Sequence, residues 1–189
     1  MSADLHVGRL PAIPALERPD LLAAPVASFL ESWPGAADVG VAEIDPELAD
    51  TAAFCAAYDV LPAASANCVI VAGRRGDVTT MAACIVLATT RADVNGLVRR
   101  RLDARKASFA PMDVAVAETA MEYGGITPIG LPADWPILVD AAVVAAGDVV
   151  IGSGLRRSKL VLAGQALGRL PGAEVIEALA VPVTPASAG

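Results

Sequence analysis

The segment Gly124-Gly125-Ile126-Thr127-Pro128-Ile129-Gly130 decides how the second half of this chain is organised. Three glycines and a proline within seven residues are incompatible with a regular helix or strand. The segment follows a stretch of helical character and precedes one of strand character, so we predict a loop. Such a loop offers backbone amides to a ligand rather than reactive side chains. Taken alone, it is also compatible with a tight connector that has no further role.

Length and composition indicate one globular domain. The chain has 189 residues, of which 55% are hydrophobic, and this is enough for a sizeable core. No apolar run reaches the roughly 20 residues that cross a bilayer, and no signal peptide is recognisable. We therefore expect a cytoplasmic protein with no membrane partner.

The residues that most often carry catalysis or metal binding are scarce. His6 is the single histidine, which argues against a triad built on a serine or cysteine with histidine. The three cysteines, Cys55, Cys68 and Cys84, show no metal-binding spacing and predict buried free thiols. No Walker or dinucleotide-binding pattern is present. Neither a metal nor a cofactor is expected.

Charge is unevenly distributed. Residues 1–60 carry two basic and ten acidic groups, whereas residues 61–189 carry twelve basic and eleven acidic groups, within a net charge of -7. Two basic clusters, 99–106 and 156–159, could bind phosphates. A solvated helix face and a solvated loop are the alternatives for these clusters.

Periodicity and turn residues predict an α+β fold. Helices are expected at 20–33, 45–58, 93–102, 111 to the glycine loop, and 164–170. Strands are expected at 39–44, 68–71, 79–88, 107–110, 136–140, 148–152 and 160–162, with 175–179 either strand or helix. We expect a single compact domain (19–181) after an N-terminal loop segment (1–18) and before a flexible tail (182–189). Its sheet should be mixed, mostly antiparallel, and curled or partly closed into a barrel, with helices on its flanks.

Three blocks of sequence, in order, resemble the YbaK-type aminoacyl-tRNA deacylase family, which includes the editing domain inserted in bacterial prolyl-tRNA synthetases. The first runs from the hairpin at 68–88 through the helix at 94–103 to Arg105-Lys106-Ala107. The second is the glycine loop with the strand at 137–140. The third is Val150-Ile151-Gly152-Ser153-Gly154-Leu155-Arg156. Together they cover about residues 50–180.

The resemblance implies hydrolysis of the ester that joins a mischarged amino acid to tRNA, acting in trans, on substrates of the prolyl-tRNA type. In that family the glycine loop lines the aminoacyl pocket, and the 2′-hydroxyl of the terminal adenosine assists the attack, with no metal. The partners implied are the aminoacylated 3′ end of tRNA and a synthetase; the oligomeric state stays open between monomer and homodimer. For catalysis the resemblance points to Asn67, Gly125 and Ser153. For substrate binding it points to Gly124, Ile126, Thr127, Pro128, Gly152 and Gly154, and for tRNA binding to Arg99, Arg100, Arg101, Arg105, Lys106 and Arg156.

Two positions depart from the family pattern. Asn67 stands where the family usually has a lysine that meets the terminal phosphate or ribose, and asparagine carries no charge. The serine of the last glycine turn falls on Gly152, with Ser153 displaced by one residue. A non-catalytic module that binds an aminoacyl group or a tRNA end is therefore the alternative function. A partner-binding protein that uses its acidic N-terminal third is a further one, which the absence of a pocket near Asn67 and the glycine loop would favour.

Overall fold

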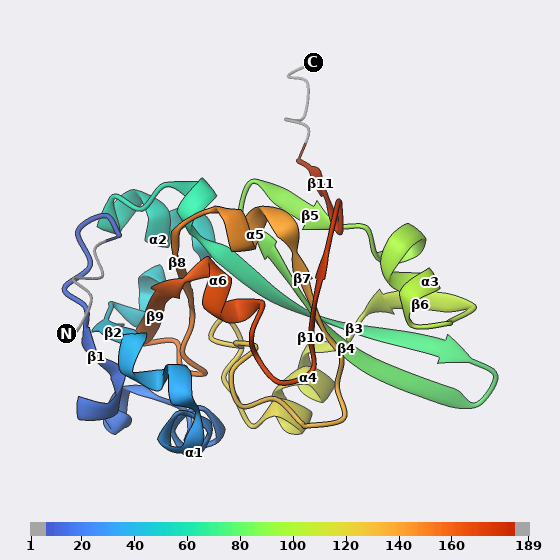
Figure 1. Cartoon of the computed structure of the whole chain (residues 1–189), viewed down its shortest axis with the longest axis horizontal. Helices are drawn as coiled ribbons and strands as arrows, with labels where there is room; N and C mark the ends of the chain where they lie inside the picture. Colours follow the sequence, from blue (N-terminus) through green and yellow to red (C-terminus); the bar gives the residue numbers. More distant parts are fainter. Residues whose placement is uncertain (1–6, 184–189) are drawn as a thin grey trace.

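The computed structural model describes residues 7–183, and the α+β class predicted from the sequence is confirmed (Figure 1). Its largest sheet has the order β10-β7-β4-β3-β6. The strands are β3 (Ala66–Arg75), β4 (Val78–Leu87), β6 (Lys106–Phe109), β7 (Ile137–Asp140) and β10 (Ala173–Ile176). β7 is parallel to both β4 and β10, whereas β3 is antiparallel to β4 and β6. The sheet is therefore mixed, as expected.

A second sheet of four antiparallel strands lies beside the first, in the order β1-β2-β9-β8. The strands are β1 (Ile13–Pro14), β2 (Gly40–Glu43), β8 (Asp148–Gly152) and β9 (Ser158–Ala163). A parallel bridge between Ser65 and Val150 joins the start of β3 to β8. A pair of short strands, β5 (Thr90–Ala92) and β11 (Ala180–Pro182), completes the sheet structure. The expected single curled sheet is thus divided into two sheets that meet at β3 and β8.

The helices are short, and proline explains where many begin. Four of the 3-10 helices start at a proline, whose fixed φ suits the first helical position. The α-helices are α1 (Ala24–Ser32), α2 (Thr51–Tyr58), α3 (Arg99–Arg101), α4 (Met112–Thr119), α5 (Ala141–Ala145) and α6 (Gly164–Leu167). The remaining helical turns are η1 (Ala15–Glu17), η2 (Pro19–Leu21), η3 (Pro34–Asp38), η4 (Pro46–Leu48), η5 (Pro62–Ala64) and the π-helical η6 (Val94–Val98). None of the helices between residues 7 and 183 is long and apolar enough to cross a membrane.

Several predicted elements are divided or extended in the structure. The helix expected over 45–58 is η4 followed by α2, with Ala49 and Asp50 between them. The helix expected over 20–33 is likewise η2 followed by α1. Asp93 caps η6 at the start of the helix expected over 93–102, since its carboxylate accepts hydrogen bonds from the Gly96 and Leu97 amides. Of the segment 175–179, Val175 and Ile176 end the strand β10. Of the predicted tail, residues 184–189 lie outside the described residues.

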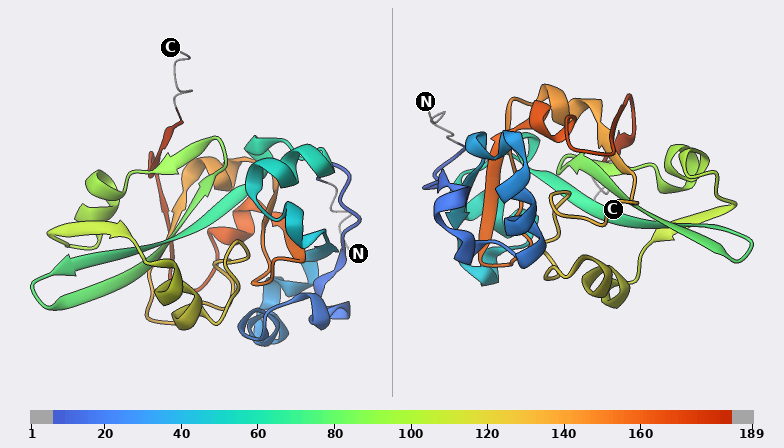
Figure 2. Two further views of the ribbon diagram at one scale, coloured as in Figure 1. Left: turned by 180° about the vertical axis from the view of Figure 1, so that it is seen from behind. Right: turned by 60° about the horizontal axis from the view of Figure 1, so that its bottom comes forward.

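The β3–β4 hairpin is longer than predicted and projects from the body of the protein (Figures 1 and 2). Its turn is Gly76-Asp77, because the pairing of β3 with β4 continues to Arg75 and Val78. Near its base the two faces of the hairpin alternate in sequence, as the pleat requires. Ile70 and Ile85 face the main core, whereas Val71 and Val86 face a second core under η6. The base is therefore held on both faces, and the start of β3 is a rigid wall.

Candidate active site

A cavity of about 520 Å³ opens where the two sheets meet. Its walls come from the start of α2, the first half of β3, the residues around the start of α4, the glycine loop, and the β8–β9 pair. The residues are Ala49, Asp50, Thr51, Phe54, Ser65, Ala66, Asn67, Cys68, Val69, Ile70, Phe109, Ala110, Met112, Ala115, Tyr123, Gly124, Ile126, Val150, Ile151, Gly152 and Lys159. The volume is in the range of small-molecule sites.

Two glycine turns, 122–125 and 152–155, pack directly against each other and form one wall. The Gly154 amide donates to the Gly125 carbonyl at 2.7 Å, and the Glu122 amide donates to the Gly154 carbonyl at 2.8 Å. A Cβ atom on Gly125 would lie 2.7 Å from the backbone carbon and oxygen of Leu155, closer than real Cβ atoms approach. Glycine is thus required at Gly125 by the close approach of two backbones.

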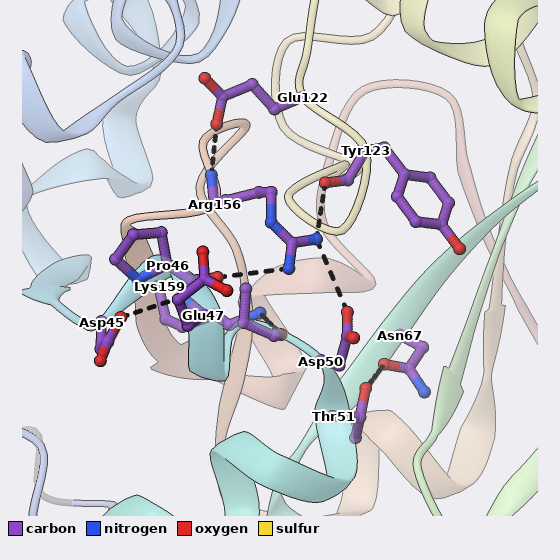
Figure 3. A network of polar contacts seen from close by, with 11 residues as sticks. Asp45, Pro46, Glu47, Asp50, Thr51, Asn67, Glu122, Tyr123, Arg156 and Lys159 are labelled. Carbon is purple, nitrogen blue, oxygen red and sulfur yellow. Dashed lines mark hydrogen bonds and ion pairs between the residues drawn. The ribbon is translucent and has the colours of Figure 1, made fainter.

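Arg156 fastens this wall to the segment before α2 (Figure 3). Its guanidinium donates to the carbonyls of Tyr123 and Pro46, each at 3.2 Å, and lies 3.6 Å from the Asp50 carboxylate. Its own amide donates to the Glu122 carboxylate at 2.6 Å. The side chain therefore spans the rim of the cavity from the glycine loop to η4.

Two polar side chains reach the start of α2 from different strands. Asn67, on β3, accepts a hydrogen bond from the Thr51 hydroxyl at 2.9 Å. Lys159, on β9, donates from Nζ to the Ala49 carbonyl at 3.0 Å. Ala49 lies in the break between η4 and α2, so its carbonyl is outside the ladder of either helix. Figure 3 shows Asn67 and Lys159 on either side of this helix start.

The Lys159 ammonium is held in an apolar environment. The residue is 8% exposed, and Nζ lies 5.2 Å from the centre of the Phe54 ring. Burial is the main cause that lowers the pKa of Lys159 to about 8; the Arg156 charge acts in the same direction, and Asp50 and Cys55 act in the opposite one. A buried lysine with such a pKa is a frequent feature of functional sites.

The cavity offers no activated thiol. Cys55, Cys68 and Cys84 are all free, as the sequence predicted, and Cys68 lines the cavity. Burial raises the pKa of the Cys68 thiol far above its ordinary range and that of Cys84 to about 12. Since the thiolate is the nucleophilic form, these sulfur atoms are inert near neutral pH.

Residues 45–170 match a family model for the aminoacyl-tRNA editing domain. The chain belongs to the aminoacyl-tRNA editing domain family. The match includes all three blocks that carried the sequence resemblance, and family membership supports a hydrolase of the deacylase type. No curated protein matches the chain.

Solved structures show that the editing domain has the expected fold. One is a candidate trans-editing enzyme for prolyl-tRNA synthetase, with a TM-score of 0.69 and 20% identity; the match covers 82% of this chain and 94% of the other. Another is a scaffold protein used for grafting linear epitopes, with a TM-score of 0.70 and 21% identity over 82% of this chain and 95% of the other. At these identities the likeness concerns the fold.

The editing domain brings some of the sequence-predicted pocket residues together and leaves others behind the wall. Asn67, Gly124, Ile126 and Gly152 line the cavity. The residues that do not line it are Gly125, Thr127, Pro128, Ser153 and Gly154.

The residues behind the wall are packed into the structure. The Ser153 hydroxyl is buried and hydrogen-bonds with Ser158. Thr127 is fully buried, and its hydroxyl has no hydrogen-bond partner within the described part of the chain. The Gly125 amide donates to the Glu122 carbonyl at 2.9 Å. These residues shape the wall of the editing domain from within.

The residues predicted to bind tRNA fall into two groups. Arg99, Arg100, Arg101, Arg105 and Lys106 lie along α3 and the start of β6, beside the projecting hairpin (Figure 1). Arg101 is paired with Glu174, whereas Arg100, Arg105 and Lys106 are exposed. Arg156 belongs to the rim of the cavity instead.

The buried position of Lys159 was not apparent from the sequence of the editing domain. The sequence grouped Lys159 with Arg156 and Arg157 as one basic cluster, but the structure separates the three side chains. Arg157 is exposed and donates to the Asp20 carbonyl, away from the cavity. The sequence carried no signal that separates Lys159 from Arg157, because residues 158–162 are all buried and show no alternation, and residues two apart lie on the same face of a regular strand.

Proposed function

We propose that this protein hydrolyses the ester bond of mischarged aminoacyl-tRNA in trans, on substrates of the prolyl-tRNA type. The observation that carries the proposal is the cavity between Asn67 and the glycine loop, in a chain of the editing family. Gly124, Ile126 and Gly152 form the wall of this cavity on the side of the glycine turns, and two of the three have no side chain. Such a wall can position an ester carbonyl without a protein nucleophile.

The chemistry available in the cavity favours a substrate-assisted reaction. The Cys68 thiol is protonated, and no histidine is found among the residues that line the cavity. Water therefore attacks the ester carbon with help from the 2′-hydroxyl of the terminal adenosine. The ester C–O bond breaks, and the 3′-oxygen takes up a proton as the amino acid is released.

The charge distribution supports an approach of tRNA along β6. This strand begins at Lys106, near the exposed Arg100 and Arg105, and ends at Phe109 on the cavity. Phosphates held at its start would lead the 3′ end towards the opening. Within the acidic N-terminal third, β1 and α1 lie at the opposite end of the molecule from the hairpin (Figure 1), whereas Asp50 lines the cavity and is paired there with Arg156.

A panel of mischarged tRNAs, prolyl and other, tests this proposal. We expect release of the amino acid well above the spontaneous rate for at least one member. The same tRNA ending in 2′-deoxyadenosine should react about 100-fold more slowly, because the assisting hydroxyl is absent. If no member of the panel is hydrolysed faster than in buffer alone, the protein is not a deacylase.

A non-catalytic module that binds the tRNA end is the second candidate, and Asn67 favours it. This side chain is uncharged and already hydrogen-bonded to Thr51. The variant Asn67→Lys separates the two functions. If the parent protein is active, we expect the substitution to leave that activity unimproved. A parent without activity that gains hydrolysis in Asn67→Lys would instead establish the binding module.

A further inference from the structure

The cavity contains a buried cation whose hydrogen-bonding capacity is largely unused. An ammonium group has three N–H donors. The Lys159 ammonium gives one of them to the Ala49 carbonyl, and its Nζ lies 5.2 Å from the centre of the Phe54 ring. No carboxylate of the described residues lies within 4.0 Å of the ammonium. The acidic residue Asp50, which also lines the cavity, is paired with Arg156. Two donors are left for the space that the cavity encloses.

A buried ammonium with unused donors destabilises the protein unless a ligand binds to it. Burying a charge is unfavourable unless it is paired and hydrogen-bonded. The position could be filled by an apolar side chain of similar length, because the neighbouring Phe54 belongs to an apolar cluster. An ammonium at this position, at the edge of a cavity, can instead bind a negatively charged group of a substrate.

The reacting end of the tRNA is the ligand whose negative charge complements this ammonium. We propose that the Lys159 ammonium binds an anionic oxygen of the aminoacylated terminal nucleotide, and so provides the cation that Asn67 does not. This inference rests on the proposed function. Two oxygens carry the required charge: the phosphate next to the terminal nucleoside, and the ester carbonyl oxygen as it becomes negative during attack. Lys159 stands across the start of α2 from Asn67, so both side chains border the same part of the cavity (Figure 3).

The first test compares the wild type with Lys159→Met and Lys159→Gln on the most reactive mischarged tRNA. Both variants keep an unbranched aliphatic stem of nearly the same length and remove the charge. We expect kcat/KM to fall by about 30-fold or more, the size expected for losing one charge-assisted hydrogen bond. The wild-type rate decides the proposed function, whereas the ratio of variant to wild type decides the role of Lys159. Folded variants within about threefold of the wild type would overturn the inference.

The second test needs no hydrolysis. The probe is a 3′-aminoacylamido-3′-deoxyadenosine whose amide cannot be cleaved, prepared with and without a 5′-phosphate, and its affinity is measured by calorimetry. If Lys159 meets the phosphate, Lys159→Met should weaken binding of the phosphorylated probe alone, by about tenfold or more. If it meets the acyl oxygen, binding of both probes should weaken. Equal affinity of wild type and variant for both probes, or no binding by the wild type, would overturn the inference.

Discussion

Gly125→Val is expected to abolish deacylation and to lower the free energy of unfolding by about 3 kcal/mol or more. The new Cβ would meet the Leu155 backbone at 2.7 Å. Backbone cannot rotate away as a flexible side chain can, so the two glycine turns must separate.

Chemical denaturation and the rate on mischarged tRNA measure the two effects. Gly76→Ala is the matched control, since a Cβ added to Gly76 would have nothing within 4 Å, and the residue has a φ of +61°. That positive φ alone should cost about 1 kcal/mol. A Gly125→Val protein as stable as Gly76→Ala would show that the two turns are not in contact in solution.

Lys159→Met is expected to make the protein more stable at pH 7 even as it impairs activity. The folded protein lowers the pKa of Lys159 from 10.5 to about 8. A shift of this size corresponds to at most about 3 kcal/mol against folding while the amine is charged. Loss of the hydrogen bond to Ala49 offsets about 1 kcal/mol of this, so we expect a net gain of about 1–2 kcal/mol.

The stability that Lys159→Met gains over the wild type should decrease as the pH rises. Below about pH 8, Lys159 is protonated in both the folded and the unfolded protein, and the full cost is present. Between about pH 8 and 10.5 the unfolded chain binds more protons, so the wild type gains stability as the pH rises. The advantage of Lys159→Met should therefore shrink across this window.

Unfolding curves at pH 7 and pH 10 check this prediction. Lys106→Met is the control, because Lys106 is exposed and its replacement should change stability by less than about 0.5 kcal/mol. The chain has two lysines, Lys106 and Lys159. A ¹³C-methyl label on both amines therefore gives two lysine resonances, and that of Lys159 should titrate near pH 8. A Lys159→Met protein less stable than the wild type at pH 7 would mean that the buried charge is compensated.

Elements that depend on local chemistry could be predicted from the sequence. The Asp93 cap and the glycine loop follow from the preferences of single residues and their neighbours. The order of the three family blocks also located the wall of the cavity. The division of the sheet could not be predicted, because it depends on pairings between strands distant in the chain, such as β2 with β9 and β4 with β7.

The details of the cavity depended on packing between segments. The sequence pointed to Gly125 and Ser153 as pocket residues, but the close contact between their turns places both behind the wall. In the same way, Lys159 could not be separated from Arg157 until the strand β9 was paired with β2 and β8. Which face of a strand is buried is decided by partners far away in sequence.

The contact between the two glycine turns has a consequence for engineering and for natural exchange of segments. The segments 122–130 and 152–156 form one structural unit. Hydrogen bonds join them, and their backbones approach too closely to leave space for a Cβ atom on Gly125. A glycine loop transplanted alone from a related protein would lack the second glycine turn against which it packs. Altered substrate choice is therefore best sought by transplanting both pieces together, with Arg156 retained as the fastening between them.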